Sequence, residues 1–514
     1  MKNHSEPRHQ ELGGIFDTTG VVRGEDGIKR YEGLPRNLVQ MFRAAVDQNG
    51  AAEAVVETGA ENAGSPRLSY ASLWDRAARV AGGLRGLGVR RGDRVAIRLG
   101  NGVDWVLAFL GAVLADAIVV PVNTRFTEEE ADYVVTDSGA TYVFMPGAPL
   151  PDGDPLVVDD QEPAGPAAIF YTSGTTGFPK GAVTSHENFL SNAETCRRAL
   201  SVDPAGLRTL ISVPLFHVTG CNSQLLVALY VGGTAVIMPV FEVAAFLHAI
   251  EAERIDTMVT VPAIYWLAIS QPAFADVDIS HVRSVSYGGA PIAPDLVARL
   301  GKAFPQARLG NGFGLTETAS VSTFLPHEFV AHADSVGFPA PVCDVRLDAV
   351  GPDGTGELLI RGPNVVSGYW NKPEATADTF VDGWLHSGDA ARIDEEGLVY
   401  LVDRLKDMIN RGGENVYCVE VENALAGAPG VYEAAVLGVP DEMMGEKVGA
   451  VIVPMPGISL DIPAVVGYLG EHIADFKVPQ YVAVSSTPLP RNPGGKLLKR
   501  RLREDVDWAA AFRR

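Results

Sequence analysis

Tyr171-Thr172-Ser173-Gly174-Thr175-Thr176-Gly177-Phe178-Pro179-Lys180-Gly181 follows an apolar segment at residues 167–170 that is typical of a buried strand. Glycines let backbone N–H groups approach an anion, the hydroxyls donate further hydrogen bonds, and the lysine adds a compact positive charge. The run therefore predicts a phosphate-binding loop. It differs from the Walker loop because Lys180 is followed by glycine and not by a hydroxyl residue. A flexible linker is the alternative for this composition.

The chain around this run alternates between helical and strand patterns. Apolar residues at helical spacing over 73–87 precede an apolar strand at 94–97. The same order recurs, with a helix over 103–114 before a strand at 117–120 and a helix over 243–254 before a strand at 257–260. This alternation predicts a doubly wound α/β architecture.

The alternation of helices and strands ends near residue 340. Shorter strands are expected at 345–347, 356–360 and 398–402, which predicts a small β-rich subdomain. A compact α+β segment follows, with a helix over 419–426 and strands at 434–439 and 448–453. Residues 1 to about 35 are polar and glycine-rich and are expected to form a tail or a packing arm.

Length, composition and charge limit the possible domain organisation, partners and cellular location of the protein. A chain of 514 residues should divide into several domains. Its 63 acidic and 42 basic residues give a net charge of −21, which disfavours nucleic acid as a partner. The four cysteines show no metal-ligand spacing, and the polar N-terminus lacks a signal peptide. The apolar stretch 105–122 fits a helix followed by a strand better than a membrane span, so we expect a cytoplasmic protein without an integral membrane segment.

Three later stretches carry residues suited to a nucleotide. In residues 311–317, an aromatic ring followed by Gly-Leu-Thr-Glu can stack on a base, contact phosphate and hold Mg²⁺ through a carboxylate; a glycine-rich turn with a capping threonine is the alternative. Asp389 and Arg404 suit ribose hydroxyls, with a surface salt bridge as the alternative. Lys496 lies on a Gly/Pro loop, where most lysines are solvated surface charges.

In order and spacing, these motifs resemble the adenylate-forming (ANL) superfamily of acyl-CoA synthetases, peptide-synthetase adenylation domains and luciferases, from about residue 35 to residue 505. The resemblance implies an α/β N-terminal domain over 1–403, with two doubly wound subdomains and a small β-barrel-like subdomain. It implies a hinge at 404–406 and a smaller, mobile α+β C-terminal domain over 407–514.

The resemblance also implies roles for individual residues. It assigns catalysis to Lys496, Thr316 and Glu317, with Glu317 as the metal ligand. The implied nucleotide-binding residues are Thr172, Ser173, Gly174, Thr175, Thr176, Gly177, Lys180, Gly289, Ala290, Asn311, Gly312, Phe313, Asp389 and Arg404. Those of the acyl pocket are His217, Gly288, Gly314 and Leu315, those of a coenzyme A tunnel are Gly412, Gly413 and Glu414, and the hinge residue is Lys406.

Two of these pocket positions bear on the substrate. Acetate-specific members of the superfamily carry tryptophan at the place of Gly314, so glycine implies room for a longer or bulkier acid. His217 matches a position that gates the pocket in aryl and fatty acyl members, and a hydrogen-bonded core histidine is the alternative.

The implied activity is that of a fatty-acid or aryl-acid CoA ligase that uses ATP, Mg²⁺ and coenzyme A. The acid would form acyl-AMP and pyrophosphate, and the thiol of coenzyme A would then take the acyl group. Three alternatives stay open: loading of a carrier protein, a single half-reaction, and a nucleotide-binding regulator without turnover. The identity of the acid and formation of a homodimer are also open.

Overall fold

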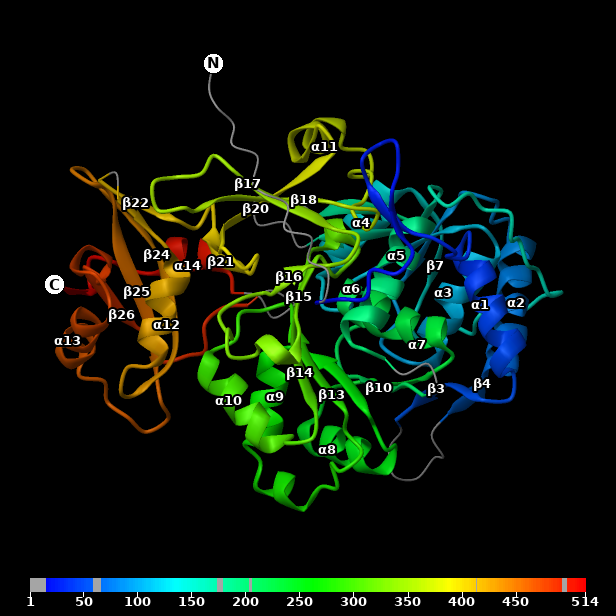
Figure 1. Ribbon diagram of the computed structural model, residues 1–514, viewed down its shortest axis with the longest axis horizontal. Helices are drawn as coiled ribbons and strands as arrows, with labels where there is room; N and C mark the ends of the chain where they lie inside the picture. Colours follow the sequence, from blue (N-terminus) through cyan, green and yellow to red (C-terminus); the bar gives the residue numbers. More distant parts are fainter. Residues whose placement is uncertain (1–14, 59–65, 173–178, 203–205, 413, 492–496) are drawn as a thin grey trace.

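A computed structural model describes residues 15–58, 66–172, 179–202, 206–412, 414–491 and 497–514 (Figure 1). Nine strands form the largest sheet, in the order β16-β15-β14-β13-β12-β10-β11-β3-β4. They are β3 (Glu53–Glu57), β4 (Arg67–Ser69), β10 (Arg208–Ile211), β11 (Thr234–Ile237), β12 (Thr257–Thr260), β13 (Ser284–Gly288), β14 (Arg308–Phe313), β15 (Thr323–Leu325) and β16 (Phe338–Pro339). In this sheet order, each neighbouring pair between β14 and β3 is parallel. The pairs at the two ends, β16-β15, β15-β14 and β3-β4, are antiparallel.

A second sheet has the order β7-β5-β6-β8-β9. Its strands are β5 (Arg94–Ile97), β6 (Ile118–Pro121), β7 (Ala140–Phe144), β8 (Pro166–Thr172) and β9 (Lys180–Ser185). Helix α3 (Val103–Leu114) has a buried side chain at nearly every position, as expected for a helix that is apolar all round. One core cluster joins α3 to side chains of both sheets, so α3 lies in a layer between them.

Further helices complete this layered arrangement. The shared core also contains α1 (Leu38–Asn49), α2 (Tyr70–Gly86), α5 (His186–Ala199) and α7 (Leu226–Val231). Helices α8 (Val243–Ala252), α9 (Pro262–Ile269) and α10 (Pro294–Ala303) belong to a separate core with the nine-stranded sheet, and α4 (Glu128–Ser138) packs on the second sheet. Two sheets covered by helices confirm the doubly wound α/β prediction.

The β-rich subdomain is an antiparallel sheet in the order β17-β18-β20-β19, with β21 paired to β20. Its strands are β17 (Asp344–Asp348), β18 (Gly356–Arg361), β19 (Phe380–Val381), β20 (Trp384–Ile393) and β21 (Val399–Arg404). The arm at the N-terminus forms a hairpin of β1 (Val21–Arg23) and β2 (Lys29–Tyr31). Arg23 and Lys29 both bind Asp344 of β17, at 2.8 and 3.0 Å, so the described part of this segment is a packing arm.

The C-terminal α+β unit lies at one end of the molecule, at the left of Figure 1. It contains β22 (Ile409–Arg411), β23 (Glu414–Val416), β24 (Val431–Asp441), β25 (Gly445–Pro454), β26 (Tyr481–Val484) and β27 (Phe512–Arg513). Its helices are α12 (Cys418–Ala426), α13 (Ile462–His472) and α14 (Lys499–Asp505), and it has its own apolar core. The helix and the two strands predicted here lie inside α12, β24 and β25.

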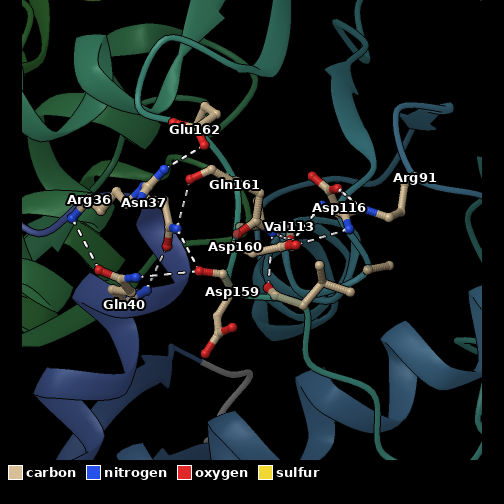
Figure 2. A network of polar contacts seen from close by, with 12 residues as sticks. Arg36, Asn37, Gln40, Arg91, Val113, Asp116, Asp159, Asp160, Gln161 and Glu162 are labelled. Carbon is tan, nitrogen blue, oxygen red and sulfur yellow. Dashed lines mark hydrogen bonds and ion pairs between the residues drawn. The ribbon is translucent and has the colours of Figure 1, made fainter.

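An extended segment, residues 150–162, crosses helices α2 and α3 on its way to β8, because Leu156 N donates to the Ala78 oxygen and Val158 N to the Leu114 oxygen. Figure 2 shows the last part of this segment, Asp159 to Glu162, beside the start of α1. The side-chain amide of Asn37 donates to the backbone oxygens of Asp159 and Gln161, at 2.9 and 3.1 Å. A Cβ on Gly82 would lie 1.8 Å from the oxygen of Asp154, so this crossing requires glycine in α2. The segment fixes the start of β8, the strand that leads into the phosphate-binding run. None of the helices in the described part of the chain is both long enough and apolar enough to cross a membrane.

Candidate active site

The site begins where β13 and β14 end side by side. Gly288 and Gly312 are register partners in this parallel pair, and a Cβ on Gly288 would lie 2.3 Å from the Gly312 oxygen. Gly289 follows with φ of +72°, a conformation that favours glycine. Parallel sheets bind ligands at the carboxyl ends of their strands. The glycines thus bring backbone polar groups to that edge, with Asn311 held nearby by a 3.1 Å bond to the Ser335 oxygen.

Thr316 and Glu317 form a single 3₁₀ turn, Thr316–Thr318, directly after β14. Tyr369 donates its phenolic hydrogen to Glu317 Oε1 at 2.7 Å. Burial and the Glu317 carboxylate raise the pKa of Tyr369, so its hydroxyl stays a donor. Lys180 Nζ lies 4.9 Å from the centroid of the same ring. Tyr369 therefore connects the predicted metal ligand to the predicted phosphate lysine.

Asp389 and Arg404 meet as register partners of β20 and β21. Asp389 Oδ1 lies 2.6 Å from Arg404 Nε, and Asp389 is only 5% exposed. The sequence placed both residues at one ribose site, and the structure does bring them together. Arg404 lowers the pKa of Tyr369, against the larger effects of burial and Glu317. The phenol itself contacts the charged side chains of Glu317 and Lys180.

The described residues of the predicted phosphate-binding run lie at the end of β8 and the start of β9, where Thr172 and Lys180 are register partners. Ser173, Gly174, Thr175, Thr176 and Gly177 lie outside the described residues, as do Lys496 and Gly413. Within the described chain, no cluster of three or more His, Cys, Asp or Glu side chains is arranged to hold a metal ion.

A narrow cavity of about 60 Å³ adjoins the strand ends. Its lining combines the loop glycines with apolar side chains, and the lining residues are Cys196, Ala199, Leu200, Val218, Thr219, Ser223, Val259, Ser286, Tyr287, Gly288, Gly289, Gly312, Phe313, Gly314, Ser320, Val321 and Phe324. Of the four residues predicted for an acyl pocket, Gly288 and Gly314 line this cavity. Leu315 and His217 are not in this lining: Leu315 packs against the core of the β-rich subdomain, and His217 precedes the lining residues Val218 and Thr219.

Next to Gly314, the wall of the cavity is a strained loop. Ala319 and Ser320, neither of them glycine, have φ of +51° and +127°. The Ser320 hydroxyl lies 2.6 Å from that of Ser223, which belongs to a π-helical turn, Cys221–Leu225. Three buried amides also hold this loop, because Asn222 and Asn364 donate to its carbonyls and Asn192 accepts from Val321 N at 3.0 Å. Short π-helical turns often occur at functional sites.

Buried titratable groups near the cavity are neutral. Burial lowers the pKa of His217 to about 4, and its Nε2 has no hydrogen-bond partner among the described residues. Burial raises the pKa of Cys196 to about 12 and that of Cys221 well above its usual value. Neither thiol is therefore an activated nucleophile, and both pack in the core.

The predicted hinge and tunnel residues follow β21. Leu405 N donates to the Gly388 oxygen at 3.0 Å, and Asp407 N to the Arg404 oxygen at 2.9 Å, so Lys406 lies in a turn. Burial lowers the pKa of Lys406. Gly412, with φ of +63°, is at the tip of the β22–β23 hairpin, and Glu414 lies 3.7 Å from Arg411.

Sequence reasoning missed several residues of this site. Ser223, Ser320 and the three asparagines carry no local signal, because each makes its contact with a distant part of the chain. The one cue for Tyr369 was its place in Ser367-Gly368-Tyr369-Trp370, where an aromatic pair follows a glycine after the β-rich segment begins.

Comparisons with known proteins agree with this geometry. The AMP-binding enzyme family matches residues 42–162 and 148–370, and the AMP-binding enzyme C-terminal domain matches residues 420–496. A feruloyl-CoA synthase of an Amycolatopsis species is 39% identical, covering 86% of this chain and 94% of its own. The long-chain-fatty-acid–CoA ligase FadD13 of Mycobacterium tuberculosis is 35% identical, covering 91% and 98%.

A solved structure supports the same assignment. ATP-bound MatB from Rhodopseudomonas palustris superposes with a TM-score of 0.82 at 30% identity, covering 91% of this chain and 98% of its own. The matched residues include the strand ends that carry Gly288 and Gly312, and most of the C-terminal unit. This chain is a member of the adenylate-forming AMP-binding enzyme family.

Proposed function

We propose that this protein is an acyl-CoA synthetase that joins a carboxylic acid to coenzyme A at the expense of ATP. The contacts of Tyr369 with Glu317 and Lys180, beside a cavity at the strand ends, carry the proposal. A cation and a hard carboxylate suit a metal-bound triphosphate, and the apolar side chains of the cavity suit a carboxylic acid. The two relatives described above, a feruloyl-CoA synthase and a long-chain-fatty-acid–CoA ligase, support the same activity.

In the first step, the carboxylate of the acid attacks the α-phosphorus of ATP and the bond to pyrophosphate breaks. We assign Phe313 to the adenine, Asp389 and Arg404 to the ribose, and Thr316 to the α-phosphate. Lys180 and the hydroxyls of residues 172–176 would hold the outer phosphates. Lys496 would reach the reacting oxygens and stabilise the charge that grows on them.

Glu317 fits a role as ligand of Mg²⁺, because its carboxylate is ordered by Tyr369 and offers hard oxygen atoms. When bound, the ion would neutralise charge on the phosphates of the nucleotide.

In the second step, the sulfur of coenzyme A attacks the acyl carbon of acyl-AMP and AMP leaves. We assign the path of the thiol arm to Gly412, Gly413 and Glu414. We assign the change between the two steps to rotation about Lys406, in a hinge at 404–406. In this rotation, residues 407–514 would move against residues 1–403. The four described cysteines are free and buried, which suits the reducing cytoplasm.

Separate measurement of the two steps tests this function. Purified protein is incubated with ATP, Mg²⁺ and a panel of aryl and fatty acids, and pyrophosphate and thioester are measured with coenzyme A or with a phosphopantetheinylated carrier protein as acceptor. We expect pyrophosphate release with at least one acid and thioester formation with coenzyme A. Thioester on the carrier protein alone would assign the loading function, and acyl transfer from supplied acyl-AMP without pyrophosphate release would assign a single half-reaction.

A further inference from the structure

We propose that Tyr369 is a positioning residue that holds the Glu317 carboxylate in place and keeps it apart from Lys180. The roles of Glu317 and Lys180 toward metal and phosphate rest on the proposed function. The contacts themselves do not: Tyr369 Oη lies 2.7 Å from Glu317 Oε1, and Lys180 Nζ lies 4.9 Å from the centroid of the tyrosine ring. The phenol thus stands between a carboxylate and an ammonium group.

Backbone hydrogen bonds hold the segment that carries Tyr369 to both neighbours. Val366 N donates to the backbone oxygen of Glu317 at 2.9 Å, on the turn that follows β14. On the other side, Trp370 N donates to the Gly181 oxygen at 2.7 Å, one residue after Lys180. The ring is therefore placed by the fold between Glu317 and Lys180, and its position does not require a bound nucleotide.

Side-chain packing fixes the ring further. Tyr369 N donates to Thr376 Oγ1 at 2.9 Å, and the ring of Phe380 lies 5.7 Å away in an edge arrangement. These contacts involve the backbone and the ring face, and only the hydroxyl reaches Glu317. The hydroxyl and the ring can therefore be separated by mutation.

The chemistry of the phenol suits this place. A direct ion pair between Lys180 and Glu317 would have to break each time a metal–nucleotide complex bound, because both groups would already be neutralised. A phenol is an uncharged donor, so it orients the carboxylate and leaves its negative charge available. Its ring face attracts an ammonium group only weakly. In agreement, no described carboxylate lies within ion-pair distance of Lys180.

The variant Tyr369→Phe tests this role because it keeps the ring and removes the hydroxyl. ATP binding to the full chain is measured by calorimetry over a series of Mg²⁺ concentrations. We expect the Mg²⁺ concentration that gives half-maximal ATP affinity to rise by about tenfold or more, the size expected for one hydrogen bond to a charged group. In a Glu317→Ala background, which removes both the charge and the acceptor oxygen, adding Tyr369→Phe should change ATP binding by less than about twofold, because no acceptor is left to hold.

Tyr230→Phe is the matched control. Tyr230 also donates its phenolic hydrogen to a buried glutamate, Glu194, at 3.0 Å, and it does not line the cavity. This variant should leave the Mg²⁺ dependence unchanged. If Tyr369→Phe does not fold, Tyr369→Leu, which also lacks the donor, should show at least the same increase.

The outcomes separate the two proposals. If the wild type binds no ATP, the proposed function fails. If the wild type binds ATP but the Mg²⁺ dependence of the Tyr369 variant matches it, Tyr369 does not position Glu317. An equal effect of Tyr369→Phe with and without the Glu317 carboxylate would show a purely structural role and would also overturn the inference.

Discussion

Asp389 and Arg404 face each other across β20 and β21, and 2.6 Å separates Asp389 Oδ1 from Arg404 Nε. Backbone pairing in the same register places both residues, so their ion pair is formed by the sheet itself. The guanidinium group holds in place a carboxylate that is otherwise buried. A fixed carboxylate is suited to accept the two hydroxyls of a ribose.

We predict that Asp389→Asn reduces the preference for ATP over 2′-deoxy-ATP. An amide offers one acceptor oxygen in place of two, so affinity for ATP should fall by about tenfold, the effect of one hydrogen bond to a charged group, while 2′-deoxy-ATP should lose less. Dissociation constants for both nucleotides check this.

Asp344→Asn is the control for that prediction. Asp344 is a buried carboxylate in the same sheet that binds Arg23 at 2.8 Å. Its replacement should lower thermal stability and leave the ratio between the two nucleotides unchanged. An unchanged ratio in Asp389→Asn would remove the ribose assignment.

Much of the fold could be predicted because periodic patterns mark its elements. The strand expected at 94–97 and the helix at 103–114 have those bounds in the structure, since each is bordered by glycine or polar residues. The crossing segment at 150–162 was not predicted, because it has no periodicity and its order comes from amides and carbonyls of α1 to α3. Gly82 reads as a weak point of a helix until the crossing chain is known.

Some residues of the site could likewise be predicted from the sequence, and others could not. Glycine-rich runs and charged residues carry a signal of their own, and Asp389 was expected beside Arg404. Tyr369 lies 52 residues from Glu317 in the sequence, so its contact depends on how the β-rich sheet packs against β9. The shape of the cavity likewise depends on the strained turn at Ala319 and Ser320, which no local pattern revealed.

Lys406→Pro should separate the two half-reactions. Proline fixes φ, so a residue whose backbone must rotate between the two steps could no longer do so. We expect acyl-AMP formation to persist while thioester formation falls by on the order of tenfold or more, because domain rotation gates the second step. Lys406→Ala removes the charge alone and should retain both steps. Equal rates for wild type and Lys406→Pro would place the hinge elsewhere.

Lys496→Ala should suppress acyl-AMP formation by on the order of a hundredfold or more, a typical loss when one charge-stabilising group is removed. Thioester formation from supplied acyl-AMP should remain, since that step does not use the lysine. Pyrophosphate release and thioester formation are measured separately. Lys302→Ala, which removes an exposed lysine of α10, serves as the control. Wild-type adenylation by Lys496→Ala would refute the assignment.

Gly314 is confined by the loop that follows it. A Cβ at this position would lie 1.3 Å from the Ser320 oxygen. That loop cannot withdraw easily, because Asn222 Nδ2 donates to the Ala319 oxygen at 2.8 Å and Asn192 Oδ1 accepts from Val321 N. A side chain at residue 314 would thus displace the backbone before it filled the cavity, so the close approach of the two chain segments requires glycine here.

Gly314→Ala is therefore predicted to impair the enzyme with every acid, short ones included. Overpacking of this kind costs at least about 1 to 3 kcal/mol, so the melting temperature should fall together with kcat/KM. Gly301→Ala is the control, because a Cβ there would meet only Leu309 at 3.8 Å, and it should keep wild-type stability. Kinetics over acids of increasing length test this prediction. If Gly314→Ala keeps its activity on short acids and loses activity only on long ones, the added methyl group points into the cavity. The loop at Ser320 would then move more readily than its hydrogen bonds imply.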